Sequence, residues 1–152
     1  MAVTYIKSGG QTGIDKMSLE VGRKLGLKTG GTAPLGWKTE NGPDYSLEGF
    51  GLIQSQSSDY TIRTIKNIQD SDGTVVFGNS KSVGSKLTIR MCGVHQKPYI
   101  INPSPVELNA WLNLNNIKTL NGAGNRASKL SVTKLKEYED ILTQALILNK
   151  IS

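Results

Sequence analysis

Short apolar runs alternate with amphipathic stretches along most of this chain. The runs have the length of buried strands and cover residues 3–6, 73–77, 99–101 and 117–121. Elsewhere apolar residues recur every three or four positions, which predicts helices over residues 14–25, 58–70, 83–94, from 104 onwards and over 131–149. This alternation predicts an α/β fold: a Rossmann-like, doubly wound, mainly parallel sheet in a three-layer α/β/α arrangement.

The predicted helices carry start signals and apolar stripes. Thr12 and Asp15 have the spacing of a capping box. Ser104 is followed by a proline in the first turn and by a glutamate three residues on, which also indicates a helix start. Ile62, Ile65 and Ile68 are expected to face the core from one helix, and the apolar positions of the next are Val83, Leu87, Met91 and Val94.

Residues 30–56 are rich in glycine, proline, serine and glutamine, and we interpret most of them as a long functional loop. Such a loop could cover a ligand. Trp37 within it could stack on a ligand ring or could anchor the loop. Its other candidate residues are Pro34, Gly36, Glu40, Asn41 and Gly42.

Three polar loops follow predicted strands, at residues 8–13, 78–85 and 121–128. In a doubly wound sheet, ligands bind outside the carboxyl ends of the strands, so we expect the three loops to share one edge. Backbone N–H groups at the helix start after the first loop suit a phosphate or another oxyanion, and Ser8 and Thr12 add hydroxyl donors. The first loop is neither a Walker A loop nor a strict Gly-x-Gly-x-x-Gly motif.

Charged residues outside these loops supply further candidates. Arg63 and Asn67 lie four positions apart on one helix face, where the arginine could hold an anion or pair with Asp59 or Asp70. Asp70 and Asp72 could bind a metal, hydrogen-bond ribose hydroxyls or transfer protons, or could simply belong to a turn.

Composition narrows the class of protein. The 152 residues suit a single domain over residues 1–152. No apolar run approaches the roughly 20 residues of a membrane span, and the first residues lack the features of a secretion signal, so we expect a cytoplasmic protein with no membrane partner. Cys92 and His95 are each the sole residue of their type, which argues against a disulfide, a zinc site and Cys–His or Ser–His–Asp catalysis.

Glycine and charge are distributed unevenly. The 17 glycines gather in short groups, as in tight turns or where a backbone approaches a ligand. The net charge is +6, and Glu107 is the only acid between Gly73 and Lys136. This favours an anionic partner, although a solvated lysine-rich surface would look the same. The scattered basic residues and the few aromatics that accompany them argue against nucleic acid as a partner.

Several segments, taken in order, resemble the putative molybdenum carrier family. They are residues 8–15, Gly31, 34–36, 41–43, Arg63, Asn67, 70–74, 78–88 and 120–128. That family belongs to a Rossmann-like group that also includes the molybdenum cofactor carrier proteins and the "lonely guy" cytokinin-activating phosphoribohydrolases. The resemblance implies a nucleotide- or cofactor-binding protein that forms a homo-oligomer, a dimer or a tetramer.

Two departures from that group matter. The phosphoribohydrolases carry a Pro-Gly-Gly-x-Gly-Thr-x-x-Glu segment whose glutamate is needed for hydrolysis, whereas residues 78–88 hold no carboxylate. This favours binding without turnover. The last motif usually has proline before its arginine, and Asn125 stands there instead, so we expect a looser loop at Arg126.

The sequence therefore predicts a binding protein for a small phosphorylated, nucleotide-like ligand, which it carries, senses or sequesters. Molybdenum cofactor and a nucleotide-derived signal are the candidate ligands. The alternative is a nucleotide N-glycosidase or phosphoribohydrolase that uses Asp15, Asp70 or Asp72. The predicted ligand-binding residues are Ser8, Gly9, Gly10, Gln11, Thr12, Gly13, Asp15, Pro34, Arg63, Asn67, Asp70, Asp72, Gly78, Ser82, Gly84, Ser85, Thr88, Asn121, Gly124 and Arg126.

Overall fold

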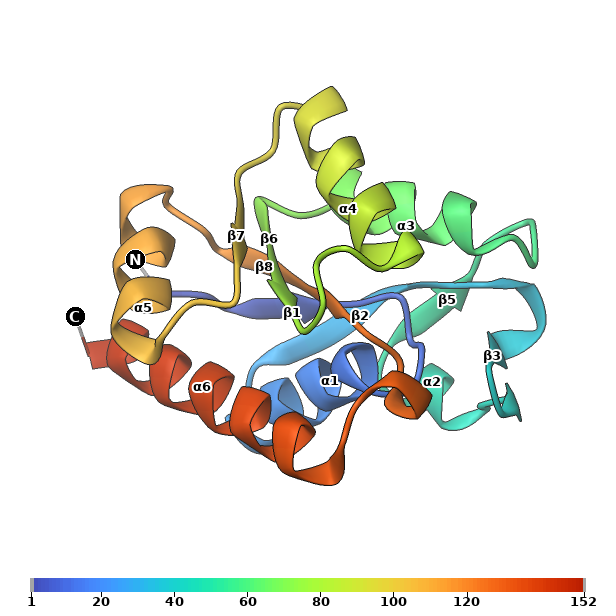
Figure 1. Ribbon diagram of the computed structural model, residues 1–152, viewed down its shortest axis with the longest axis horizontal. Coiled ribbons are helices and arrows are strands. Elements are labelled where there is room, and N and C mark those ends of the chain that lie inside the picture. Colours follow the sequence, from blue (N-terminus) through green and yellow to red (C-terminus); the bar gives the residue numbers. More distant parts are fainter. Residues whose placement is uncertain (1, 152) are drawn as a thin grey trace.

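A six-stranded sheet forms the centre of the protein, as the computed structural model shows for residues 2–151 (Figure 1). Its strand order is β5-β2-β1-β8-β6-β7, and every neighbouring pair is parallel. The strands are β1 (Tyr5–Lys7), β2 (Lys28–Ala33), β5 (Leu52–Gln54), β6 (Gly73–Phe77), β7 (Tyr99–Ile101) and β8 (Thr119–Gly124). The predicted Rossmann-like α/β fold is confirmed.

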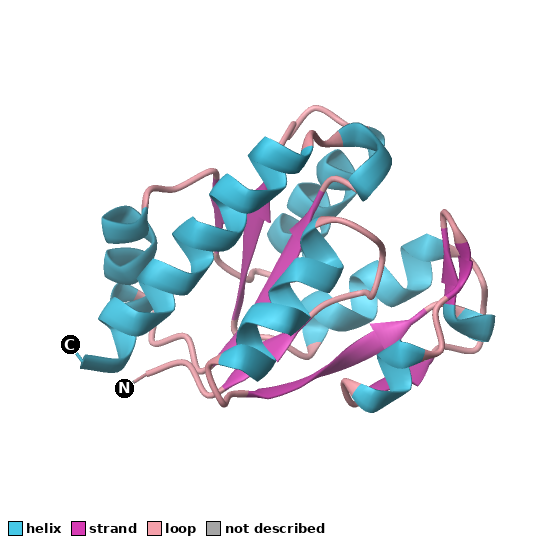
Figure 2. Ribbon diagram, turned by 90° about the horizontal axis from the view of Figure 1, so that it is seen from below, coloured by secondary structure: helices cyan, strands magenta, loops and turns pink. Residues whose placement is uncertain are grey.

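Helices cover both faces of the sheet, as the two perpendicular views show (Figures 1 and 2). One face carries α1 (Ile14–Lys24), α5 (Pro105–Leu114) and α6 (Val132–Ile151), and the other carries α3 (Tyr60–Gln69) and α4 (Val83–Val94). The smaller elements are the 3-10 turns η1 (Leu35–Trp37) and η2 (Ala127–Lys129), the short helix α2 (Ser46–Gly49), and a hairpin of β3 (Lys38–Thr39) and β4 (Gly42–Pro43).

The last strand of the sheet lies between strands from early and middle parts of the chain. In β8, Leu120 pairs with Ile6 of β1, and Gly122 pairs with Val75 of β6. Strands β1, β8 and β6 are therefore neighbours, although more than a hundred residues separate β1 from β8. Because all three are parallel, the segments that follow them emerge side by side at one edge of the sheet.

Two apolar clusters hold these layers together. The larger lies between the sheet and α1, α5 and α6, and includes Ile6, Val75, Leu108 and Leu142, all fully buried. The smaller anchors the segment that follows β2. Its buried residues are Leu19, Ala33, Trp37, Leu47, Phe50 and Leu52.

The interpretation of residues 30–56 as mostly a loop is wrong. Strands β2 and β5, helix α2 and the β3–β4 hairpin occupy much of this segment. The glycines in β2 had indicated a loop, but a Cβ at Gly31 would lie 2.2 Å from the carbonyl oxygen of Ser8, so close packing of two backbones requires glycine there. Trp37 lies in the smaller apolar cluster and anchors the segment.

The expected apolar faces of α3 and α4 are partly wrong. Ile68 is buried, but Ile62 is exposed. In α4, Val83 and Val94 are 88% and 63% exposed, and the helix instead buries Ser85, Thr88 and Cys92. The sheet beneath α4 presents polar side chains, among them buried Thr74 and Asn121.

The two predicted helix starts have different outcomes. Helix α5 begins where it was predicted, and Ser104 and Glu107 form a capping box there. The box between Thr12 and Asp15 is absent: Gly13 occupies the N-cap of α1 and provides no side chain. Thr12 and Asp15 instead bond to residues of other segments, because the loop after β1 packs against three neighbouring elements.

Two glycine substitutions are expected to change stability in opposite directions. A Cβ at Gly124 would lie 2.3 Å from the carbonyl oxygen of Phe77, so Gly124→Ala should lower the free energy of unfolding by about 2 kcal/mol. At Gly93 in α4, no atom lies within 4 Å of the point that a Cβ would occupy, so Gly93→Ala should raise it by about 0.5–1 kcal/mol. Urea denaturation would measure both, and equal effects would contradict this packing.

Candidate functional site

The loops after β1, β6 and β8 contact one another at the carboxyl edge of the sheet. The Ile14 N–H donates to the Asn125 carbonyl (3.1 Å), which joins the first and third loops. The Asn79 N–H donates to Oδ1 of Asn125 (2.6 Å), which joins the second and third. The sequence-based expectation that these polar loops share one edge is therefore met by their geometry.

The side chain of Asn125 joins the second and third loops through hydrogen bonds. It is only 6% exposed, and its Nδ2 donates to the Asn79 carbonyl (3.3 Å) and to Oγ of Ser82 (3.1 Å). A Cβ at Gly78 would lie 2.2 Å from Oδ1 of Asn125, so the asparagine fits only against a glycine. The expectation of a looser loop at Arg126 is wrong, because the asparagine side chain replaces the rigidity of proline with hydrogen bonds.

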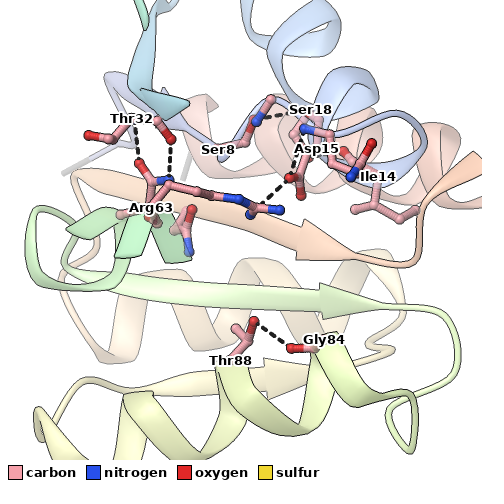
Figure 3. Close-up of polar contacts among 12 residues, drawn as sticks. Ser8, Ile14, Asp15, Ser18, Thr32, Arg63, Gly84 and Thr88 are labelled. Carbon is pink, nitrogen blue, oxygen red and sulfur yellow. Dashed lines mark hydrogen bonds and ion pairs between the residues drawn. The ribbon is translucent and has the colours of Figure 1, made fainter. Parts of the chain in front are cut away.

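Arg63 of α3 reaches across the end of β1 to Asp15 of α1 (Figure 3). Its Nη1 lies 3.3 Å from Oδ2 of Asp15. Gly9 makes this crossing feasible, because a Cβ there would lie 2.1 Å from the same nitrogen. Of the alternatives left open for Arg63, pairing with Asp59 or Asp70 is not found: Asp59 caps α3, and Asp70 pairs with Lys66 on the helix surface.

This ion pair is largely excluded from water. The Arg63 and Asp15 side chains are 14% and 4% exposed. Burial raises the pKa of Asp15, whereas the Arg63 charge and the Gln11 N–H both act to lower it. The Arg63 Nε is buried and has no hydrogen-bond partner within residues 2–151. A buried donor without a partner is costly, and it marks a place where a polar group would be stabilised.

A small polar cavity opens beside the Arg63–Asp15 pair. It has room for about one water molecule. Six of the residues predicted from the sequence line it, together with Thr64, Gly122 and Ala123: they are Gly9, Asp15, Arg63, Asn67, Thr88 and Asn121. The edge of the sheet thus brings together residues from α1, α3, α4 and β8.

Several lining side chains already have internal partners. The Asn67 amide bonds both backbone groups of Thr32, at 2.8 and 2.9 Å, and so fixes α3 to β2. The Thr88 hydroxyl donates to the Gly84 carbonyl (Figure 3), and Asn121 Nδ2 donates to the Thr74 hydroxyl. These residues shape the cavity while also holding the fold.

The start of α4 is the most open of the predicted donor groups. Ser82 caps the helix, and its Oγ accepts the Ser85 N–H (3.3 Å). The first N–H groups of a helix have no partner within the helix, and those of Val83 and Gly84 have none elsewhere in the described chain. No atom lies within 4 Å of the position of a Cβ on Gly84, and the Ser85 Oγ is buried without a partner among the described residues.

The first loop, by contrast, uses most of its own donors. The Gly10 N–H donates to Ser8 Oγ, the Gln11 N–H to the Asp15 carboxylate, and the Thr12 N–H to Gln11 Oε1. Gly13 packs against the backbone of residues 125–127, and Gly124 packs against the Phe77 carbonyl. These groups lie at the predicted edge but are engaged with the protein itself.

Two predicted residues lie elsewhere. Asp70 and Asp72 precede β6 and so occupy the amino edge of the sheet, opposite the loops. Asp72 Oδ2 accepts the N–H groups of Lys118 and Thr119 at 3.0 and 2.9 Å, where β8 begins. Pro34 is buried at the end of β2, and exposed Arg126 follows β8, both at the carboxyl edge.

From the sequence, Glu40 was named only as part of a segment that could cover a ligand and Ser128 only as part of the third loop, and neither was among the predicted ligand-binding residues. Glu40 stands in the turn of the β3–β4 hairpin, and its carboxylate accepts hydrogen bonds from the hydroxyls of Thr12 and Ser128 and from the Ser128 N–H. The hydrogen bond from Ser128, followed by that from Thr12, lowers the pKa of Glu40. Only the position of Glu40 in the glycine-rich segment hinted at this contact, because its partners lie 28 and 88 residues away.

Neither a metal centre nor a membrane span is found in the part of the chain that the structure describes. Within residues 2–151, no three histidine, cysteine or carboxylate side chains gather as metal ligands would. None of the described helices is both long and apolar enough to cross a membrane.

Fold and site together define a Rossmann-like α/β protein with a polar cavity at the carboxyl edge of a parallel sheet. The profile of the Circularly permutated YpsA SLOG family matches residues 6–146, and the chain belongs to that family. Among curated proteins, no match was found.

Two solved structures are similar to this chain. One is the crystal structure of a protein named putative molybdenum carrier protein from Syntrophus aciditrophicus SB. It is 33% identical, with a TM-score of 0.85 over 95% of this chain and 96% of that one. The other, an E-1-hydroxy-2-methyl-but-2-enyl-4-diphosphate reductase from Plasmodium falciparum, is 13% identical, with a TM-score of 0.39 over 93% of this chain and 52% of that one.

Removal of Arg63 should leave a buried carboxylate without its counter-charge. Arg63→Ala is expected to lower the free energy of unfolding at pH 7 by about 3 kcal/mol. Burial raises the pKa of Asp15, so in the folded protein this carboxylate takes up a proton at a higher pH than in the unfolded chain. Once protonated it is neutral and no longer needs a counter-charge. The loss of stability should therefore shrink as the pH falls through that pKa. Denaturation at several pH values would show it, and a pH-independent loss would contradict the role of Asp15. Asp15→Asn in the same chain should restore part of the loss.

Proposed function

We propose that this protein binds a small phosphorylated, nucleotide-like ligand at the carboxyl edge of its sheet, in the cytoplasm, and carries, senses or sequesters it. The observation that carries the proposal is the polar cavity at this edge, which six of the predicted residues line. A ligand-carrier role agrees with the family and with the name of the similar crystal structure. Molybdenum cofactor and a nucleotide derivative are the candidate ligands.

The N-terminus of α4 is the position best suited to bind the phosphate. Two helix N–H groups point out of the helix start next to open space at Gly84, and the helix dipole favours a negative charge there. Lys81 and Lys86 lie just before and within the first turn of α4 and supply positive charge. The rest of the ligand would lie over the cavity, where Arg63 offers an unpaired donor.

The scarcity of carboxylates around the cavity, and the contacts that Asp15 already makes, favour binding without turnover. Residues 78–88 contain none, and Asp15 is the only carboxylate that lines the cavity. Asp15 is tied to Arg63 and to the Gln11 N–H. It therefore serves the structure, and a second carboxylate to complete an acid–base pair is absent from the described cavity lining.

One observation favours the alternative, a nucleotide N-glycosidase or phosphoribohydrolase. Burial raises the pKa of Asp15, and a raised pKa suits a general acid that protonates a leaving group. If this alternative holds, the protein should release free base from nucleoside monophosphates, and Asp15→Asn should abolish the release.

Gly84→Ala separates ligand binding from stability. Its new methyl group meets no atom of the protein, so it should stabilise α4 about as much as Gly93→Ala does. Only Gly84→Ala should place a methyl group where the phosphate approaches, and we expect it to weaken binding about tenfold. Calorimetry with mononucleotides and molybdenum cofactor would measure both variants, after native mass spectrometry of the purified protein has identified any bound species.

Equal affinities of the two alanine variants would refute the placement of the phosphate at α4. An absence of binding by the wild-type protein to every phosphorylated candidate would refute the function. Chemical analysis of the same incubations decides between carriage and turnover, because intact recovery of the ligand supports carriage and released base supports the enzyme.

The outward face of α4 supports a homo-oligomer, a dimer or a tetramer. Val83 and Val94 of α4 are exposed, and so are Tyr99 and Ile101 of β7. Ile100, which lies between these two, packs against the larger core, so they point to the opposite face, which carries α4. Exposed apolar patches of this kind mark contact surfaces. Val94→Lys should therefore lower the molar mass measured by light scattering, whereas Val132→Lys, at the exposed start of α6, should not. A monomeric wild-type protein would refute this proposal.

A further inference from the structure

Glu40 lies at a point where groups from three separate segments converge. The Thr12 hydroxyl comes from the loop after β1, and the Ser128 hydroxyl and N–H come from the loop after β8. The N–H distance to Oε2 is 3.1 Å, and the Arg126 Nε lies 3.9 Å from Oε1. Two hydroxyls, one amide and one guanidinium thus surround a single carboxylate that arrives from a hairpin.

This donor set is suited to an oxyanion in general rather than to glutamate in particular. All four groups donate hydrogen bonds or carry positive charge, and hydrogen bonds to an ionised acceptor are the stronger kind. They hold Glu40 ionised, as the lowered pKa of its carboxyl indicates. The oxygen atoms of a phosphate carry charge of the same sign and could accept hydrogen bonds from the same donors.

Glu40 is also the link between the hairpin tip and these loops. Its N–H donates to Gln11 Oε1 (2.9 Å), and its carboxylate makes the contacts described above. Among the described residues, no other polar contact joins positions 39–42 to the loops after β1 and β8. The base of the hairpin is held separately, by buried Trp37 and by the Lys16–Asp44 ion pair (2.6 Å). The hairpin tip could therefore separate from the loops after β1 and β8 while the base of the hairpin keeps its contacts.

The backbone before the hairpin is of the kind found in switch segments. Trp37 has a φ of +58°, in the left-handed region that residues other than glycine seldom adopt, and Gly36 before it has a φ of +80°. Packing of the indole against the smaller apolar cluster holds this conformation. Strained residues of this kind gather at ligand clamps and switches.

We propose that Thr12, Ser128 and Arg126 form an oxyanion subsite, separate from the phosphate position at the start of α4, in which the Glu40 carboxylate is an internal substitute for a second anionic group of the ligand. A phosphate that enters replaces Glu40 as the anion bound by these donors, and the hairpin tip is released. The inference deepens the proposed function, on which it rests for placing a phosphorylated ligand at this edge. The subsite itself can be tested with inorganic phosphate alone.

The test measures phosphate binding to the full chain at constant ionic strength. Glu40→Ala empties the subsite, and we expect phosphate to bind this variant about tenfold more tightly than the wild type and to raise its melting temperature. Adding Ser128→Ala to that variant should reverse the gain. Glu48→Ala removes an exposed carboxylate from the same segment and should leave phosphate binding unchanged.

Other results would overturn the proposal. An unchanged phosphate affinity of Glu40→Ala would mean that no subsite exists, and an equal gain in Glu48→Ala would mean that only net charge matters. If Glu40→Ala does not fold, Glu40→Gln replaces it, because glutamine keeps the shape and removes the charge.

Hydrogen exchange of the wild-type protein tests the release of the hairpin. Saturating phosphate should speed exchange of the Glu40 amide and leave the amides of β6 unchanged. A nucleoside diphosphate, which carries two phosphate groups, should do so at lower concentration than free phosphate. Unchanged or slower exchange at Glu40 would refute the exchange of anions. Failure of every phosphorylated candidate ligand to bind, together with a positive result for inorganic phosphate, would refute the proposed function and retain the subsite.

Discussion

The pairing of β8 between β1 and β6 is the constraint on which the rest of this structure depends. It places the final strand of the chain against the first, with Leu120 opposite Ile6 and Val75 opposite Gly122. Since the three strands are parallel, the segments that leave them must meet at one edge. The polar cavity, the contacts of Asn125 and the hydrogen bonds of the Glu40 carboxylate all lie where these segments meet.

Because these segments pack closely, most glycines at this edge are required by contacts within the protein rather than by a ligand. Gly9 leaves space for the Arg63 guanidinium, Gly78 for Asn125 and Gly124 for the Phe77 carbonyl. In each case a Cβ would fall within 2.3 Å of the neighbouring atom. Gly84 differs, because only open space adjoins it. A glycine without a packing reason, at a helix start with free N–H groups, is the more informative sign of a ligand.

The face of the sheet beneath α3 and α4 is polar, and this explains the unusual exposure of those helices. Thr74, Asn121 and Thr88 are buried there, and the Asn67 amide fixes α3 to β2. Buried polar groups need partners, so polar faces of the helices turn inward to supply them. Apolar residues of α4 then remain outside, where they support the proposed contact with a second copy of the chain.

The sequence by itself determined the strands and helices outside residues 30–56, the Rossmann-like class and the polar loops after β1 and β6. These features follow from periodicity and from turn residues, which act over a few neighbouring positions. It could not identify β2, whose glycines resemble those of a loop. The third predicted loop, residues 121–128, is in fact strand as far as Gly124. Only the tertiary structure decided that Arg63 pairs with Asp15, that Asp70 and Asp72 lie at the far edge, and that Glu40 meets Ser128. Such partners come from chain segments tens of residues apart, and strand order, which no local pattern encodes, decides which of them meet.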